Sequence, residues 1–205
     1  MLSFTKHTII LILTSLILLP SPLLAQSSAI ENIITPDSNN LQYTGRIDFT
    51  NPNSPVLYWP GTYIKTRFQG TSLSIILNDH KGQNYYNIIL DGKIYQPIIL
   101  SCKKGLHTYK VFENLSETTH ELLIFRRTET GEGPTEFKGL ILDNGKKLLP
   151  PKPKPQLKIE FYGDSITSGM GNEDESRKDN SNLALKNNFL AYGAITARNL
   201  NAQYH

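Results

Sequence analysis

The sequence predicts two kinds of fold in succession, an all-β sandwich and then the opening of an α/β domain with a parallel sheet. Residues 41–148 consist of short apolar, β-branched and aromatic runs separated by turn residues, which is typical of antiparallel strands. The proline-rich residues 149–156 predict an extended linker, because proline fixes φ and removes a backbone donor. Residues 157–205 then follow the order strand, loop and helix with which an α/β domain begins.

The first 25 residues differ in character from the rest of the chain. A short basic start at Lys6 precedes an apolar run at Thr8–Leu19, and Pro20–Ala25 offers a small residue for cleavage. This pattern is typical of a secretory signal peptide. The alternative, a membrane anchor, needs about twenty apolar residues, more than this run supplies. We therefore predict a secreted or periplasmic protein with no membrane partner once residues 1–25 are removed.

Charge balance and cysteine content exclude some classes of protein. The 205 residues carry 21 Lys and Arg against 18 Asp and Glu, which does not favour nucleic-acid binding through net charge. Cys102 is the single cysteine, so an internal disulfide is impossible and the exported protein must rely on its apolar core. We interpret Cys102 as structural, the alternative being a nucleophilic thiol. The sequence has no His-rich or Cys-rich spacing that would predict a metal site.

Residues 41–148 are predicted to form nine strands and no helix, the pattern of a β-sandwich. The strands are expected at Tyr43–Phe49, Val56–Trp59, Thr62–Phe68, Ser72–Leu77, Tyr85–Leu90, Lys93–Leu100, His107–Phe112, His120–Arg127 and Glu136–Leu142. Asp91 and Gly92 indicate a two-residue hairpin, because both central positions of a type I′ turn need positive φ. The polar residues 26–40 ahead of the sandwich are expected to be loosely ordered.

Beyond the linker, Leu157–Tyr162 is predicted as a strand and Glu173–Asn182 as a polar loop. Apolar residues at helical spacing then predict a helix over Leu183–Leu200, and a second strand would begin near Ala202. About fifty residues cannot bury both faces of a parallel sheet. We therefore expect this sequence to be a truncated piece of a longer protein.

A glycine and a serine directly after the predicted strand give the strongest indication of chemistry. Gly163, Asp164 and Ser165 lie where an apolar run gives way to a tight turn. A serine there can be exposed at a strand end and can face backbone N–H donors, as a nucleophile requires. Ser165 is our candidate nucleophile, with Asp164 more readily explained as shaping the turn than as catalytic. The alternative is a polar turn without chemistry.

The longer string Gly163-Asp164-Ser165-Ile166-Thr167 resembles block I of the GDSL, or SGNH, hydrolases. With the preceding sandwich, the chain resembles the acetyl esterases of carbohydrate esterase family 2, which join an N-terminal jelly-roll domain to a C-terminal SGNH domain. The resemblance covers nearly all of residues 41–205. The matching stretches are 45–49, 58–61, 67–73, 84–87, 90–92, 126–129 and 137–143.

The resemblance implies removal of acetyl groups from sugar hydroxyls of plant polysaccharides such as xylan or glucomannan. Ser165 would attack the acetyl carbonyl, its backbone N–H would help to bind the oxyanion, and no metal or cofactor would be needed. The family's catalytic histidine and other oxyanion donors belong to later blocks. The resemblance therefore gives no role to His80, His107, His120 or His205. We expect the chain alone to have negligible esterase activity.

Other interpretations remain open at this stage. The sandwich could bind carbohydrate without catalysis, or the serine could act on a lipid or small aryl ester. Tyr58, Trp59 and Tyr63 could form a sugar-stacking surface, although aromatic residues of a sandwich are more often core. Arg126 and Arg127, with the nearby Glu129, could pair at a seam between the domains or form a solvated strand end.

Overall fold

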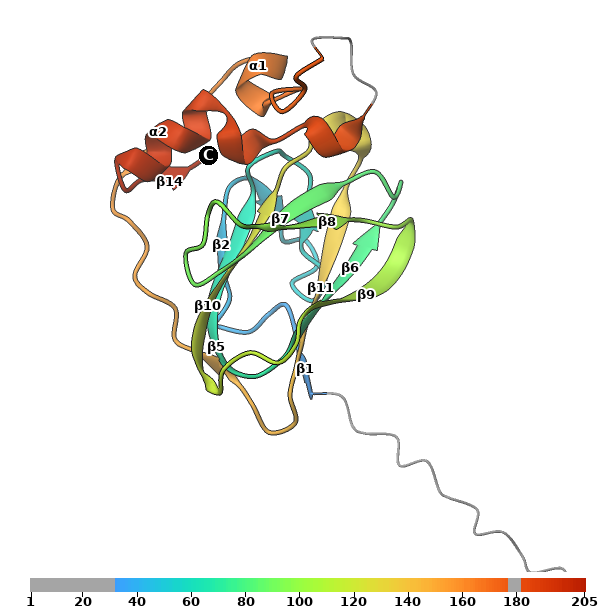
Figure 1. Ribbon diagram of the computed structural model, residues 1–205, viewed down its shortest axis with the longest axis vertical. Coiled ribbons are helices and arrows are strands. Elements are labelled where there is room, and N and C mark those ends of the chain that lie inside the picture. The colour runs from blue at the N-terminus through green and yellow to red at the C-terminus, as the bar shows by residue number, and fades with distance from the viewer. Residues whose placement is uncertain (1–31, 177–181) are drawn as a thin grey trace, which may run out of the picture.

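The computed structural model describes residues 32–176 and 182–205, so the predicted signal peptide lies outside the described residues. Two six-stranded antiparallel sheets pack face to face (Figure 1). The first contains β3 (Ile47–Asp48), β4 (Val56–Leu57), β11 (Thr135–Leu142), β6 (Leu73–Asp79) and β9 (Gly105–Phe112) in that order, with β1 (Asn32–Ile34) also on β11. The second contains β12 (Leu148–Leu149), β5 (Tyr63–Gly70), β10 (Thr118–Arg126), β7 (Tyr85–Leu90) and β8 (Ile98–Ser101), with β2 (Gln42–Thr44) also on β5. The predicted sandwich is confirmed.

The main core lies between the two sheets and follows from the alternation along the strands. In β6, Leu73, Ile75 and Leu77 are buried while the residues between them are partly exposed. Phe68 from the facing sheet and Phe137 from β11 are both fully buried in the same cluster. Fully burying a side chain of this size contributes about 1.5–3 kcal/mol, so the sandwich carries its own core.

Several details of the sandwich differ from the sequence prediction. The strand expected at Tyr43–Phe49 is two short strands, β2 and β3, which belong to different sheets. The lead before residue 41, expected to be loose, contributes β1, which pairs with the edge of β11. Asp91 and Gly92 have φ of 51° and 70° and Lys93 N donates to Leu90 O at 3.0 Å, as a tight turn requires. The next strand nevertheless begins only at Ile98, so the two-residue hairpin is wrong. A second turn, from Gln96 N to Lys93 O at 3.0 Å, uses the backbone groups that a strand would need.

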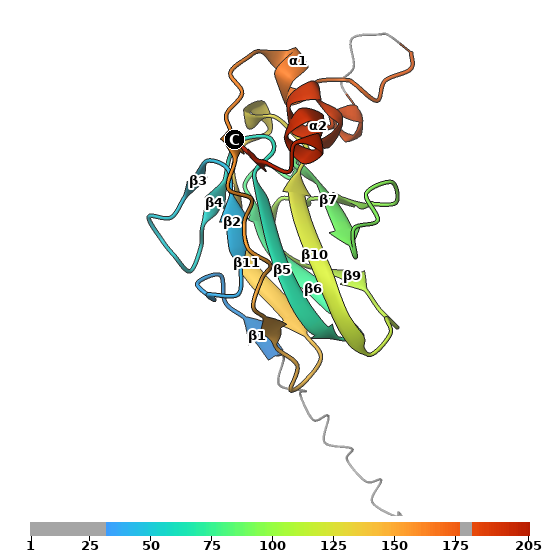
Figure 2. The same ribbon diagram turned by 90° about the vertical axis from the view of Figure 1, so that its left-hand side faces the viewer.

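The C-terminal residues form a small layer over one end of the sandwich (Figure 2). Its strands β13 (Lys158–Ile159) and β14 (Gln203–Tyr204) pair in parallel, as expected for the start of an α/β domain. Between them lie α1 (Ser165–Ser168), η2 (Leu183–Leu185), η3 (Asn188–Leu190) and α2 (Tyr192–Asn199). No helix in residues 32–176 or 182–205 is long and apolar enough to cross a membrane.

The continuous helix predicted over Leu183–Leu200 is wrong. The structure divides it into two short 3₁₀ turns and an eight-residue α-helix. The side chains of Asn182 and Asn187 accept hydrogen bonds from Ala184 N and Phe189 N. These side-chain hydrogen bonds compete with the backbone hydrogen bonds of a continuous helix. A new short helical segment therefore begins after each capping asparagine.

The C-terminal layer shares a second apolar cluster with the sandwich. Tyr63, Ile89 and Phe125 from β5, β7 and β10 pack against Phe189 and Tyr204 of the layer. The linker adds contacts along the side of the sandwich, where Gln42 Nε2 donates to Lys152 O at 3.0 Å. From residue 150 to 155 the linker forms neither helix nor strand, in keeping with its prolines. These contacts fix the small layer to one end of the sheets.

Glu136 on β11 is expected to make unfolding depend on acid pH. It contacts His80 Nε2 and accepts from Ser54 Oγ, each at 2.7 Å, and these contacts lower its pKa from 4.5 to about 2. Because the folded pKa is depressed, the stabilisation is present above pH 4.5 and is lost as the pH falls toward 2. Glu136→Gln should lower the free energy of unfolding by about 1–3 kcal/mol at pH 7 and flatten its acid dependence.

Urea unfolding between pH 2 and 7 measures both effects. Glu117→Gln is the matched control, because this carboxylate forms an exposed pair with Lys146. It should change the free energy of unfolding by less than about 1 kcal/mol. Parallel acid profiles for the wild type and the Glu136 variant would contradict the prediction.

Candidate active site

A cleft of about 680 Å³ lies between the end of the sandwich and the C-terminal layer. Gly163, Asp164 and Ser165 line it from the layer, so the structure brings the three predicted site residues together on one wall. Trp59 and Glu129 line it from the sandwich. Both parts of the chain therefore contribute to one concave surface, the usual form of a small-molecule site.

The turn between β13 and α1 places Ser165 at the first position of the helix. Asp164 Oδ1 accepts a hydrogen bond from Ile166 N at 3.0 Å, the N-cap contact expected of an Asp at a helix start. Gly163 is needed because an added Cβ would lie 1.9 Å from Thr167 Oγ1. The serine itself is exposed in the cleft wall. A hydroxyl placed in this way is accessible to a ligand.

The four described histidines differ in their surroundings. His80 contacts Glu136 and His107 contacts Lys104 O, while His120 lies 2.8 Å from Asp91 Oδ2 and 2.9 Å from Ser116 O. Burial lowers the pKa of His120, but the hydrogen bonds to Asp91 and Ser116 outweigh it and raise the pKa. These three are held by contacts within the sandwich. His205 alone among them lines the cleft, where burial and then Lys158 lower its pKa.

The three aromatic residues considered for sugar stacking separate into two groups. Tyr63 is 6% exposed and belongs to the second apolar cluster, so its sugar-stacking interpretation is wrong. Trp59 is 44% exposed and lines the cleft, with the guanidinium carbon of Arg46 lying 5.1 Å from its ring centroid. Tyr58 is also exposed and lies edge-on to Trp59. Of these three residues, Trp59 is the one that shares the cleft with Ser165.

Two arginines are buried at the end of β10, and one of them, Arg127, connects the sandwich to the C-terminal layer. Arg126 is fully buried and donates to Leu57 O at 2.6 Å and to Glu129 O and Gly133 O at 2.8 Å. Arg127 is 1% exposed and donates to Ala184 O at 2.7 Å and to the carboxylate of Glu173. Burial lowers the pKa of Arg127, and Glu173 opposes this effect. The solvated strand end is therefore wrong. The seam interpretation is confirmed for Arg127 and for Glu129, which contacts Lys186 of the layer, whereas Arg126 is bonded within the sandwich.

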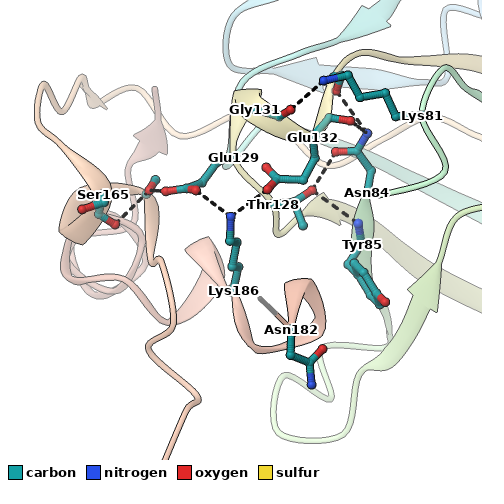
Figure 3. Close-up of polar contacts among 12 residues, drawn as sticks. Lys81, Asn84, Tyr85, Thr128, Glu129, Gly131, Glu132, Ser165, Asn182 and Lys186 are labelled. Atoms are coloured by element: carbon teal, nitrogen blue, oxygen red, sulfur yellow. Dashed lines mark hydrogen bonds and ion pairs between the residues drawn. The ribbon is translucent and has the colours of Figure 1, made fainter. Parts of the chain in front are cut away.

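Sequence reasoning missed two residues that the layer presents to this seam. Lys186 is buried and pairs with Glu129 at 2.9 Å and Glu132 at 2.7 Å (Figure 3). Asn188 Nδ2 donates to Thr167 O and to Tyr204 OH, both at 3.1 Å, and thereby ties α1 to β14. Both residues follow the polar loop in the sequence, and no local pattern distinguishes them from solvated polar residues.

Residues 43–153 match the family model described as the N-terminal domain of carbohydrate esterase 2. The chain belongs to carbohydrate esterase family 2. This family 2 chain is 38% identical over 174 residues to the cellulase/esterase CelE of Acetivibrio thermocellus, covering 84% of this chain and 21% of that protein. It is 35% identical over 170 residues to an acetylxylan esterase/glucomannan deacetylase of Cellvibrio japonicus, covering 80% of this chain and 45% of that protein.

Solved structures agree with this assignment. A family two carbohydrate esterase from Clostridium thermocellum, in complex with cellohexaose, superposes with a TM-score of 0.75 at 36% identity, over 80% of this chain and 49% of that one. A family two carbohydrate esterase from Cellvibrio japonicus gives a TM-score of 0.77 at 26% identity, over 85% and 51%. The family 2 chain thus spans half or less of the curated relatives given above.

The cleft offers no arrangement of metal ligands in the described ranges. No group of three or more His, Cys, Asp or Glu side chains there is placed to hold a metal ion. Cys102 is buried, and burial strongly raises the pKa of its thiol. A buried thiol with a raised pKa is a poor nucleophile. Among the hydroxyls and thiols weighed from the sequence, Ser165 has the exposure that nucleophilic chemistry needs.

Gly61 is expected to be essential for the fit between the two parts of this family 2 chain. An added Cβ would lie 2.2 Å from the Tyr204 ring and 2.5 Å from Asn188 Oδ1, at a φ of 77°. Gly61→Ala should therefore lower the free energy of unfolding by more than the cost of positive φ alone, which is about 1–2 kcal/mol. The melting temperature should fall accordingly. Gly92→Ala is the matched control, since its φ is 70° and nothing lies within 4 Å. Equal melting temperatures for the two variants would contradict this prediction.

Proposed function

We propose that this chain carries the nucleophile of a secreted SGNH-type serine esterase that removes acetyl groups from the sugars of plant polysaccharides. The observation that carries the proposal is Ser165, exposed at a capped turn in the wall of the cleft between the two domains. The family assignment supplies the reaction class, because the relatives are esterases by name. A sandwich that binds carbohydrate without catalysis is not favoured for the same reason.

In the proposed reaction, Ser165 Oγ attacks the acetyl carbonyl while a histidine accepts its proton. The Ser165 N–H helps to stabilise the oxyanion that forms, and the sugar leaves with a proton returned to its oxygen. Water then attacks the acetyl-serine and releases acetate. Asp164 fixes the turn, and Gly163 lets it approach Thr167 closely. None of the four described histidines is assigned as the base.

Xylan or glucomannan is the proposed substrate class. One Cellvibrio japonicus relative is an acetylxylan esterase/glucomannan deacetylase, and a Clostridium thermocellum relative was solved with cellohexaose. Trp59 fits this class, because an exposed aromatic face beside the nucleophile can pack against the apolar face of a sugar ring. The proposal places the acetylated polysaccharide outside the cell or in the periplasm, in agreement with the signal peptide predicted for residues 1–25.

Ser165→Ala should abolish acetate release from acetylated xylan by the full-length protein. Loss of a serine nucleophile lowers turnover by several orders of magnitude, roughly a millionfold in the best-studied triad. Ser101→Ala is the matched control, because Ser101 is an exposed serine at the end of β8. It should leave the rate unchanged. Equal rates for the wild type and the Ser165 variant would remove Ser165 from the mechanism.

Trp59→Ala should raise KM for acetylated xylo-oligosaccharides by roughly tenfold, which corresponds to about 1.4 kcal/mol of lost binding. Activity on a small aryl acetate, which has no sugar ring to stack, should change little. Tyr95→Ala is the control, because Tyr95 is 92% exposed and lies outside the cleft lining. The same KM increase on both substrates would contradict a stacking role, and an unchanged KM on both would place the polysaccharide elsewhere.

A further inference from the structure

The helix that follows the candidate nucleophile has little apolar support of its own. α1 is four residues long and none of its residues is buried. A helix this short is not stable by itself, because it forms too few hydrogen bonds to offset its nucleation cost. Its position must therefore be fixed by contacts with neighbouring elements. Two come from its own layer, Asn188 to Thr167 O at 3.1 Å and Tyr192 OH to Thr167 Oγ1 at 2.9 Å.

A further contact comes from the sandwich. Glu129, just before the 3₁₀ turn η1 (Thr130–Glu132), accepts a hydrogen bond from Ser168 Oγ through Oε1. Ser168 Oγ also lies 2.9 Å from Ser165 O, the carbonyl of the candidate nucleophile. A serine hydroxyl has one proton to donate, and an ionised acceptor forms the stronger bond. The hydroxyl therefore donates to Glu129, and Ser165 O retains the N–H of Met170 at 2.9 Å.

The Glu129 carboxylate is itself held in place. Its Oε2 lies 2.9 Å from Lys186 Nζ, and the same ammonium lies 2.7 Å from Glu132 Oε1 (Figure 3). The side chains of Lys186 and Glu132 are 8% and 7% exposed. One buried ammonium between two carboxylates leaves negative charge to be satisfied. The Ser168 hydroxyl supplies a hydrogen bond to that charge, so the sandwich and α1 hold each other in place.

We infer that Glu129 is a positioning residue for the nucleophile. Through Ser168 it fixes the C-terminal end of the four-residue α1, and with it the peptide group of Ser165, although it comes from the sandwich. This inference rests on the proposed function of Ser165. It makes the sandwich a part of the catalytic apparatus rather than an appended module. Glu132, which shares Lys186 but does not contact Ser168, provides the matched comparison.

Hydrogen–deuterium exchange on the 205-residue chain tests the positioning without any activity. Ser168→Ala removes the hydroxyl, and Glu129→Gln removes the charge of its acceptor. Both should speed amide exchange in residues 165–170 by roughly tenfold, since a hydrogen bond to a charged group is lost. Glu132→Gln should leave exchange in these residues as in the wild type. Unchanged exchange in Ser168→Ala, or equal acceleration in Glu132→Gln, would overturn the inference.

Kinetics of the full-length protein provide the second test. Glu129→Gln and Ser168→Ala should each lower kcat for acetate release by roughly tenfold to a hundredfold with KM little changed, because misplacement affects the reacting atoms more than sugar binding. The double variant should lose no more than the worse single variant, since both changes break one contact. Glu132→Gln should retain wild-type kcat. Additive losses, or an equal loss in Glu132→Gln, would overturn the inference.

A Ser165→Ala variant in the same series separates the two proposals. If that variant keeps full activity, the proposed nucleophile fails, and the positioning role inferred for Glu129 fails with it. If it is inactive while Ser168→Ala and Glu129→Gln match the wild type, Ser165 stands and the positioning role fails. Melting temperatures measured in parallel show whether any loss of kcat comes with loss of the folded chain.

Discussion

The structure depends on satisfying two charged groups, the guanidiniums of Arg126 and Arg127, which are buried at the end of β10. Successive residues of a strand point to opposite faces, so Arg126 faces the interior of the sandwich and Arg127 faces the C-terminal layer. Arg126 binds carbonyl groups of the loops around Leu57 and Gly133, and Arg127 binds Ala184 and Glu173. A buried charge without partners costs several kcal/mol. Docking of the layer buries Arg127, so the layer must also supply partners for its guanidinium, which Ala184 O and Glu173 do.

The same seam explains why the cleft exists where it does. Polar groups occupy the junction near η1, whereas Phe125, Phe189 and Tyr204 make the apolar contact. Between these two regions the chain leaves a hollow lined by Gly61 on one side and by the Ser165 turn on the other. The close approach at Gly61 allows Tyr204 and Asn188 to lie against the sandwich. The cleft thus results from how the sandwich and the C-terminal layer meet, because residues of both line it.

Much of the sandwich could be predicted from the sequence because its signals are local. Alternation in β6 and the turn at Asp91 and Gly92 depend on neighbouring residues, and the structure shows both. The prediction of one long helix over residues 183–200 was wrong, because the capping asparagines Asn182 and Asn187 interrupt an apolar pattern that is continuous in the sequence. Of the strand expected at Lys93–Leu100, only the end is present, in β8, because a second turn uses the backbone groups before it.

The candidate site likewise has a part that could be predicted from the sequence and a part that could not. The turn around Ser165 depends on adjacent residues, so its shape could be predicted from the sequence, including the capping role of Asp164. The contacts of Glu129 and Arg127 with the layer join positions 39 to 57 residues apart along the chain. A single sequence does not reveal such pairs, because nothing near Lys186 or Asn188 marks them as buried. Burial at a seam can be recognised only once both surfaces are known.

The second apolar cluster has a consequence for biosynthesis. Its sandwich members, Tyr63, Ile89 and Phe125, are translated before Phe189 and Tyr204. They lie on one sheet, whose other face belongs to the separate main core. A domain that emerges first generally folds as a unit. The folded sandwich then offers the later residues, Ser165 among them, a preformed apolar surface on which to fold.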